Sequence, residues 1–242
     1  MMRQFRTLLA ALALAATAAP ICAAPISFQI KPAQSTLSLS GVIRGTGASF
    51  FPIGQPISGS LATAYAGNLL VDSNLTQIVF MGGNVDASIN GNYLPGPSSA
   101  DYGLTASLPA PEGNLLAAIR DFAMSFNGLA TPLVSGFDMS SVTVTAVGGT
   151  FESDKLAPLP FAGATAAQVS GTGTLFSSGD LRTLSLPLTI GFSQEIPNSD
   201  YTLEFTLAGT LVATHTVPEP ATGLLLAAGA VALTRRRRHP RT

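Results

Sequence analysis

Histidine side chains, the usual acid–base groups at neutral pH, are few in this sequence and lie far from any predicted cleft. The two histidines are His215 and His239. His215 is predicted to be an exposed residue at the end of a strand, and His239 follows a run of arginines. A Ser-His-Asp catalytic set and a histidine-rich metal site would therefore lack their base or their ligands.

Two pairs of carboxylates are the remaining candidates for catalysis. Glu152 and Asp154 would share one face of a strand, and Glu195 and Asp200 flank a predicted loop. Glycosidases use such a pair as acid and base or nucleophile. Sugar-cleaving clefts also present aromatic platforms, however, and the sequence has no tryptophan and only four tyrosines. We therefore expect a solvated acidic surface, and we expect the protein not to be an enzyme.

Metal and phosphate sites have similarly weak signals. Asp72, Asn74 and the carboxylates above could offer loop oxygens to calcium, but no spacing resembles a dedicated calcium loop. The Gly-Thr-Gly triplets at 45–47 and 171–173 have no predicted helix after them, which a phosphate-binding loop requires. These triplets are predicted to be bulges or turns, and we expect neither a metal nor a cofactor.

The C-terminal part of the sequence consists of three segments in a fixed order. Val217, Pro218, Glu219 and Pro220 come first, the uncharged segment 221–234 second, and Arg235, Arg236, Arg237 and Arg238 last. Because proline is disfavoured inside a helix, a transmembrane helix is predicted to start after Pro220. The helix positions expected to contact lipid include Ala221, Leu224, Leu225, Leu226, Val231 and Leu233.

This helix is short for a membrane span. Its fourteen residues rise about 21 Å, whereas a bilayer core is about 30 Å thick. Crossing requires local thinning of the bilayer or arginines that extend their side chains to the interface. Four consecutive arginines are costly to translocate, so they are predicted to stay cytoplasmic with the rest of the chain outside. A buried helix of a soluble domain would show a polar face, which 221–234 lacks. A permanent tail anchor is another interpretation.

The order Pro-Glu-Pro, short apolar helix and arginine cluster resembles the PEP-CTERM sorting signal of Gram-negative bacteria. Pro218, Glu219 and Pro220 match its tripeptide, and the resemblance covers about 25 residues. It implies recognition by an exosortase-like membrane protease. It also implies a protein anchored in the inner membrane and facing the periplasm before processing, and then delivered to the cell surface or the extracellular space.

The N-terminal residues 1–24 have the pattern of a secretory signal peptide. Arg3 and Arg6 precede the apolar run 8–19, and small residues follow at 22–24. We expect cleavage near residue 23 or 24. The single cysteine, Cys22, would be removed with the signal peptide, so the exported protein would form no disulfide.

The expected extracytoplasmic β domain spans residues 25–216, before the sorting segment 217–242. Its length of about 190 residues is enough for one hydrophobic core. It carries five lysines and arginines against twelve acidic residues, a charge of −7, whereas the whole sequence has a formal charge of −1. An acidic surface argues against binding to nucleic acid, which requires neutralisation of phosphates.

Apolar residues alternate with small or polar ones in two consecutive segments, which predicts two paired strands with one buried face each. The alternating apolar residues are Leu184, Leu186, Leu188, Ile190 and Phe192 in the first segment, and Leu203, Phe205, Leu207 and Leu211 in the second. A loop with Pro197 and Asn198 separates them. Pro187 lacks an N–H group, so its strand is predicted to be an edge strand or to carry a bulge.

Other segments are less regular. Strands are predicted at 26–30, 37–43, 61–71, 75–81, 141–147 and 164–176. Gly148 and Gly149 are predicted to form a tight hairpin turn into 150–152. Asn114 is predicted to cap a short helix over 114–120, because Leu115, Ala118, Ile119 and Phe122 would share one helical face. This helix is predicted to run into a strand, because Phe122, Met124 and Phe126 alternate.

The predicted fold is all-β: an antiparallel β-sandwich or β-barrel with one short helix, in addition to the signal helix and the transmembrane helix. Two functions fit this fold. One is an exported, non-enzymatic surface or extracellular-matrix protein associated with biofilm or exopolysaccharide. The alternative is a lipid- or small-ligand-binding β-barrel module held at the cell envelope. An apolar cavity of several hundred Å³ would favour the second, and a solidly packed core the first.

Overall fold

The structure is a computed structural model, and it describes residues 25–45, 54–59, 62–73, 77–87, 104–109 and 113–217. Within these ranges almost every residue with regular structure is in a β-strand, and all the strand pairings are antiparallel. The predicted all-β antiparallel fold is therefore confirmed. The predicted signal helix and transmembrane helix lie outside the described residues. No helix among the described residues is long and apolar enough to span a bilayer.

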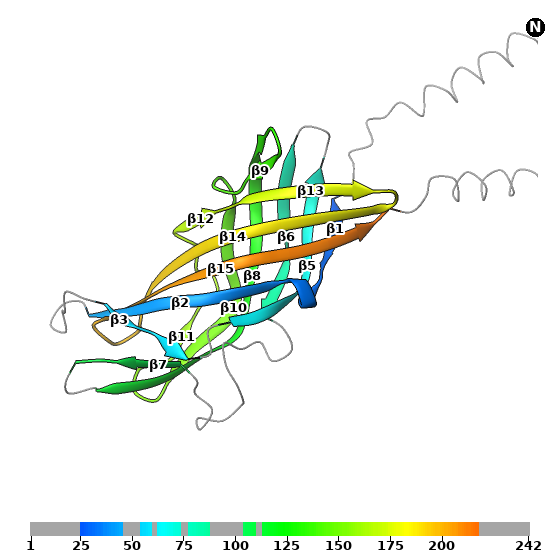
Figure 1. Ribbon diagram of the computed structural model, residues 1–242. Coiled ribbons are helices and arrows are strands. Elements are labelled where there is room, and N and C mark those ends of the chain that lie inside the picture. The colour runs from blue at the N-terminus through cyan, green and yellow to red at the C-terminus, as the bar shows by residue number, and fades with distance from the viewer. Residues whose placement is uncertain are drawn as a thin grey trace, which may run out of the picture.

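The strands form two layers that cross one another (Figure 1). The first layer consists of β2 (Thr36–Gly45), β15 (Tyr201–Thr216), β14 (Leu181–Glu195), β13 (Thr172–Ser178) and the short β12 (Gln168–Ser170). The second layer consists of β5 (Ala62–Ser73), β6 (Ile78–Ala87), β8 (Asn114–Leu133) and β10 (Thr143–Ser153). Short strands extend the edges: β3 (Gln55–Pro56), β4 (Ser58–Gly59), β7 (Leu104–Ser107) and β11 (Leu159–Pro160).

Two connections join the layers. On one side β1 (Ile26–Ile30) and β2, separated by the 3-10 turn η1 (Pro32–Gln34), pair with both β15 and β5. On the other side β9 (Gly136–Asp138) pairs with both β13 and β8. The hydrogen-bonded pairings therefore run in a closed circuit through both layers.

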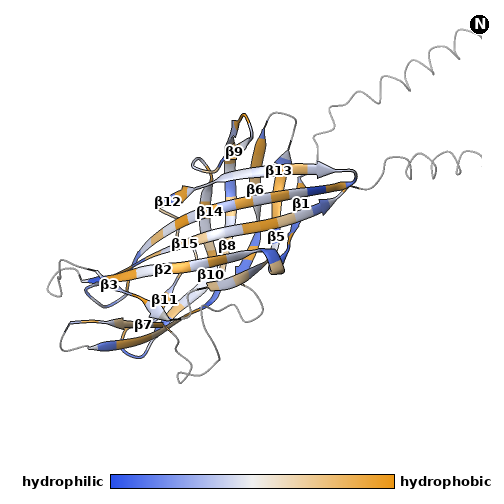
Figure 2. Ribbon diagram, viewed as in Figure 1, coloured by the Kyte–Doolittle hydropathy of each residue, from blue (hydrophilic) through white to orange (hydrophobic). Residues whose placement is uncertain are grey.

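The β14–β15 pair matches the sequence prediction. The two strands pair residue by residue from Leu181↔Thr216 to Glu195↔Thr202. The alternating apolar residues of both segments are all buried, and orange and pale bands alternate along the strands in Figure 2. Their inner faces form one wall of the core.

Aromatic rings fill the interior between the layers. The ring centroid of Phe122, from β8, lies 5.6, 5.8 and 5.9 Å from those of Phe161, Phe192 and Phe205. These three contacts are edge-on, whereas Phe192 and Phe205 stack at 5.1 Å. Both geometries are favourable for aromatic pairs. The centre of the domain is therefore packed with side chains.

The helix predicted at 114–120 is wrong, because these residues begin the long strand β8. Asp121 has a φ of 51°, which marks a bulge. Leu115 and Ile119 face inward before the bulge, and Phe122 faces inward directly after it. The alternation of inward-facing positions restarts after the bulge, so Leu115, Ile119 and Phe122 are spaced like residues on one face of a helix. This spacing explains the incorrect prediction.

The hairpin predicted at Gly148 and Gly149 is also wrong. β10 continues through both glycines, and its register with β8 shifts on each side of Gly148. Gly149 has a φ of 107° and lies against Phe122 and Arg120. A positive φ suits a bulge as well as a hairpin turn, so the glycine pair alone did not distinguish them.

Pro187 lies in a strand that is paired on both sides, so the first of the two predicted alternatives, an edge strand, is wrong, and an interruption of the pairing takes the place of the second, a bulge. The pairing of β14 with β12 ends at Ser170↔Thr189, and its pairing with β13 resumes at Thr174↔Ser185. Pro187 falls in this gap, where it has no N–H to donate. Thr172 pairs there with β9 instead.

Candidate functional site

The sorting segment predicted from the sequence begins directly after the last strand of the sheet. β15 is paired with β14 along its whole length, up to Thr216. The N–H of the next residue, Val217, donates a hydrogen bond to the carbonyl oxygen of Asp180 over 2.7 Å. Val217 is the only residue of the predicted tetrapeptide motif that the structure describes. Pro218, Glu219 and Pro220, the apolar residues of 221–234 and the four arginines lie outside the described residues.

His215, next to this segment, has a structural role. Its Nδ1 atom lies 3.0 Å from the carbonyl oxygen of Ser27, and its ring centroid lies 5.8 Å from that of Phe28. A carbonyl oxygen only accepts, so Nδ1 carries the proton in this contact. The side chain is half-buried rather than exposed, which corrects the sequence prediction. His215 thus ties the last strand to the first.

Two of the four carboxylates considered for catalysis, Glu152 and Asp154, have structural partners. Glu152 forms an ion pair with Arg120, with 2.7 Å between Oε2 and Nε. An oxygen of Asp154 accepts the backbone N–H of Leu116 over 2.8 Å. Glu195 ends β14 and Asp200 precedes β15. In the part of the chain that the structure describes, no group of three His, Cys, Asp or Glu residues is placed to hold a metal ion.

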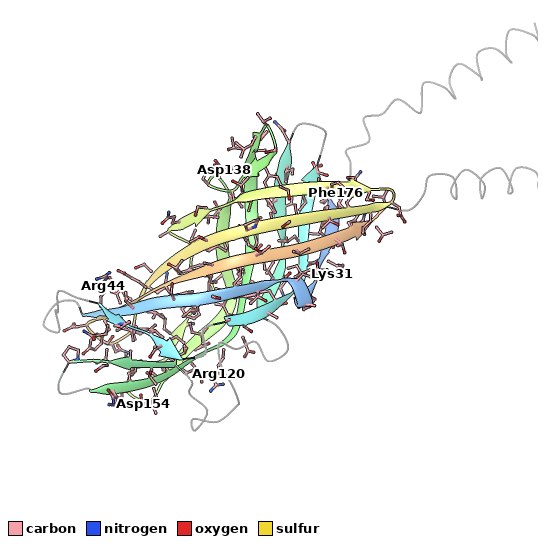
Figure 3. All side chains as sticks on the ribbon, viewed as in Figure 1. Lys31, Arg44, Arg120, Asp138, Asp154 and Phe176 are labelled. Carbon is pink, nitrogen blue, oxygen red and sulfur yellow. The ribbon has the colours of Figure 1, made fainter. Side chains whose placement is uncertain are left out.

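Asp138 caps a tight turn after β9. Its carboxylate accepts hydrogen bonds from the hydroxyl and the backbone N–H of Ser140. These two hydrogen bonds hold the pKa of Asp138 below its ordinary value of 3.8. Figure 3 shows Asp138 far from Asp154 and Arg120, so these charged residues do not form a common site.

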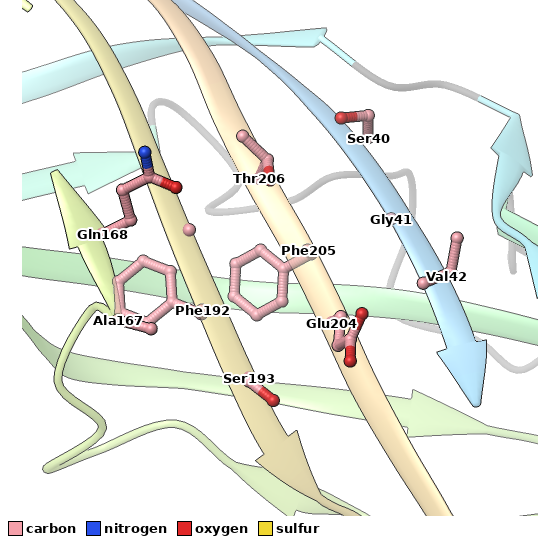
Figure 4. Close-up of a pocket in the computed structure, with 11 residues that line it drawn as sticks. Ser40, Gly41, Val42, Ala167, Gln168, Phe192, Ser193, Glu204, Phe205 and Thr206 are labelled. Carbon is pink, nitrogen blue, oxygen red and sulfur yellow. The ribbon is translucent and has the colours of Figure 1, made fainter. Parts of the chain in front are cut away.

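A shallow groove of about 400 Å³ lies on the outer face of the first layer. It crosses β2, β15 and β14 and ends at the segment leading into β12 (Figure 4). Its lining is mixed: the polar side chains are Ser40, Gln168, Ser193, Glu204 and Thr206, and the apolar residues are Val42, Ala167, Phe192 and Phe205. Its floor includes Gly191, which leaves the space between Gln168 and Thr206 open.

The side chains that line this groove offer hydrogen bonds. Hydroxyl and amide groups there both donate and accept. Glu204 is the single carboxylate among the described lining residues, and Arg44 pairs with it at 2.7 Å. The groove was not predicted from the sequence. Its signal was Gly191, a residue without a side chain at an outward position of a regularly alternating strand.

A comparison with known protein families identifies a motif at the end of the chain. The profile of the PEP-CTERM protein-sorting motif matches residues 216–238. The match begins at Thr216, the last residue of β15. No match was found among curated proteins or among solved structures.

The chain is therefore an exported protein that is sorted at the membrane. More particularly, it carries a PEP-CTERM motif, which implies processing by an exosortase, a membrane protein, and delivery to the cell surface. The resemblance found in the sequence is confirmed.

Proposed function

We propose that this chain is a non-enzymatic surface protein that is processed at its PEP-CTERM segment and associates with extracellular polysaccharide. The observation that carries the proposal is the match at 216–238 directly after the last strand of an all-β domain. Each molecule is held in the inner membrane by the segment 221–234, facing the periplasm, until an exosortase removes this segment.

The packing of the interior favours this function over the ligand-binding alternative. Phe122, Phe161, Phe192 and Phe205 occupy the centre, with ring centroids 5.1–5.9 Å apart. A lipid held between the layers would have to displace these rings. The hollow at the surface has a mixed lining, in which hydroxyl and amide groups lie beside Val42 and Ala167, and these polar groups suit the hydroxyl groups of a sugar chain.

Intact mass spectrometry of the protein from its native host, with cell fractions kept separate, tests the processing. We expect the surface and extracellular fractions to hold a species that has lost Arg235–Arg238 and ends near 218–220. A variant with Pro218→Ala and Pro220→Ala should accumulate unprocessed in the membrane. Arg235–Arg238 retained on all of the wild-type protein would leave a permanent anchor and refute the processing.

The association with polysaccharide is tested at the groove. Gly191 has no positive φ, and an added Cβ would lie 3.9 Å from both Gln168 Cβ and Thr206 Oγ1. Gly191→Leu therefore fills the groove without backbone strain. We expect it to reduce co-sedimentation with the host's own extracellular polysaccharide. The matched control is Ser185→Leu, on the same face of β14 outside the groove. Equal co-sedimentation of both variants and the wild type would rule out the groove as the binding site for the polysaccharide.

A further inference from the structure

The end of the domain that carries Val217 is held close to the bilayer by the length of the chain. Residues 218–220 alone separate Val217, fixed to Asp180 by its hydrogen bond, from the apolar segment that begins at Ala221. The four Cα–Cα steps from Val217 to Ala221 span at most about 14 Å. While the protein keeps its sorting segment, Val217 therefore lies within about 14 Å of the apolar segment's first residue, and the turn between β13 and β14 lies directly beside Val217.

This turn carries two exposed apolar side chains. Phe176, on β13, is 66% exposed, and Leu181, the first residue of β14, is 40% exposed. Leu181 is paired with both Ser178 and Thr216, and Phe176 with Thr183. The register alternates faces, so Phe176, Ser178 and Leu181 share the outer face of the sheet. Figure 3 shows Phe176 near the end of β13, and Figure 1 shows β15 ending beside it.

The outer face here is suited to a lipid interface. Between the apolar side chains in the sequence are Ser177, Ser178, Gly179 and Asp180, and Thr214 and Thr216 lie beside them on β15. Small uncharged groups lose little hydration free energy when they enter the headgroup region, and the exposed carboxylate of Asp180 can stay hydrated there. Phe176 is two residues from Ser178, about 7 Å along the strand. The headgroup region on each side of a bilayer is about 5–8 Å thick. The turn can therefore enter the headgroups and bring both apolar side chains into contact with lipid.

We propose that Phe176 and Leu181 form a membrane-contacting surface of the unprocessed protein, with the phospholipid bilayer as the partner. This inference rests on the proposed anchoring by segment 221–234. Contact with lipid would orient the domain on the membrane beside its own sorting segment. It would end when the exosortase removes that segment, because two apolar side chains alone give weak binding to a membrane.

The opposite end of the domain provides a matched control. Leu116 is 41% exposed, almost the same as Leu181, and it lies on β8 where that strand pairs with β7 at Thr105. In Figure 1 β7 lies at the other end of the molecule from the β13–β14 turn. A bilayer that contacts Leu181 would not reach Leu116.

The test uses the chain without its signal peptide, residues 25–242, which contains no cysteine. Single cysteines are introduced as Phe176→Cys, Leu181→Cys or Leu116→Cys and labelled with a polarity-sensitive fluorophore. The proteins are reconstituted into vesicles of phosphatidylethanolamine and phosphatidylglycerol, with or without lipids that carry a quenching spin label. We expect blue-shifted emission and at least about twofold stronger quenching at 176 and 181 than at 116, as for a side chain buried 5–10 Å into the interface.

The outcomes separate this inference from the proposed function. A chain that floats with the vesicles but is quenched equally weakly at 181 and 116 would refute the membrane-contacting surface and keep the anchor. A blue shift at 181 without quenching by the lipids would mean that the turn packs against protein, which also refutes it. A chain that does not float with the vesicles would refute the anchoring step and this inference together.

Discussion

His215 and Ser27 connect the two ends of the described chain. The imidazole Nδ1–H of His215 donates to the carbonyl oxygen of Ser27 over 3.0 Å. The contact joins β15 to β1 at the place where the sorting segment leaves the sheet. This strand end is therefore held from both sides, by β1 and by the Val217–Asp180 hydrogen bond with the β13–β14 turn.

Replacing His215 by alanine should weaken this end of the sheet. The variant loses one hydrogen bond and the ring contact with Phe28, for which we expect a loss of about 1–2 kcal/mol in the free energy of unfolding. Urea denaturation followed by circular dichroism measures it. An unchanged denaturation midpoint would show that the contact contributes nothing to stability.

Phe122 is the side chain on which the aromatic core depends most. It contacts three other rings and is 1% exposed. We expect Phe122→Ala to destabilise the domain by about 3–5 kcal/mol, because it leaves a cavity among those rings. Phe176→Ala removes the same group from a position that is 66% exposed, and should change the free energy of unfolding by no more than about 0.5 kcal/mol. Similar losses in the two variants would contradict the packing described here.

The contrast between β14 and β8 shows what the sequence could predict. β14 and β15 were predicted correctly because their alternation is unbroken over many residues. In β8 the bulge at Asp121 restarts the alternation, so Leu115, Ile119 and Phe122 appeared to share a helical face. The partner that selects the strand is β10, distant in sequence, whose Gly149 accommodates the bulge. Local patterns do not contain that information.

The two parts of the candidate site also differed in how far they could be predicted. The sorting segment is linear, so its tripeptide, apolar stretch and arginines were recognised without any structure. The groove depends on Ser40, Gln168 and Thr206 coming together from three strands. The sequence separation of Ser40 and Thr206 hid this neighbourhood, although they are directly paired between β2 and β15.

Gly67 and Gly179 provide a comparison of two glycines with positive φ. Gly67 has a φ of 100°, and a Cβ there would collide with the backbone carbonyl of Asn84 on the neighbouring strand. Gly179 has a φ of 60° and open space around it. We expect Gly67→Ala to lower the free energy of unfolding by about 3 kcal/mol, because of backbone strain and the collision, and Gly179→Ala to lower it by about 1 kcal/mol, because of strain alone. Chemical denaturation of both variants measures the difference. Equal losses would contradict the close approach of the neighbouring strand to Gly67.

Asp138 should make the stability of the turn after β9 depend on pH. Its folded-state pKa lies below 3.8, so its hydrogen bonds with Ser140 contribute fully above that value. The contribution is lost as the pH falls from 3.8 through the lower pKa of the folded protein. Comparing denaturation midpoints of the wild type and Asp138→Asn at neutral pH and at about pH 3 isolates this residue. The wild type should have the higher denaturation midpoint at neutral pH, and this difference from Asp138→Asn should shrink in acid. A difference in midpoint that is the same at both pH values would exclude the titration of Asp138 as a source of pH-dependent stability.

The short connection between Val217 and the apolar segment should limit how easily the exosortase reaches its motif. Because Val217 is hydrogen-bonded to Asp180, the first residue of the apolar segment lies within about 14 Å of the folded domain, and we expect the domain to obstruct the approach of a membrane protease. Inserting Gly-Ser-Gly-Ser between Val217 and Pro218 adds up to about 14 Å of reach. We expect the spacer to increase the rate of tail removal severalfold in pulse-chase experiments in the host. The same insertion after Ala162, in a turn far from Val217 in sequence, should leave the rate unchanged if the domain folds. Processing of the spacer variant at the wild-type rate would mean that the exosortase accepts the motif directly from the edge of the sheet.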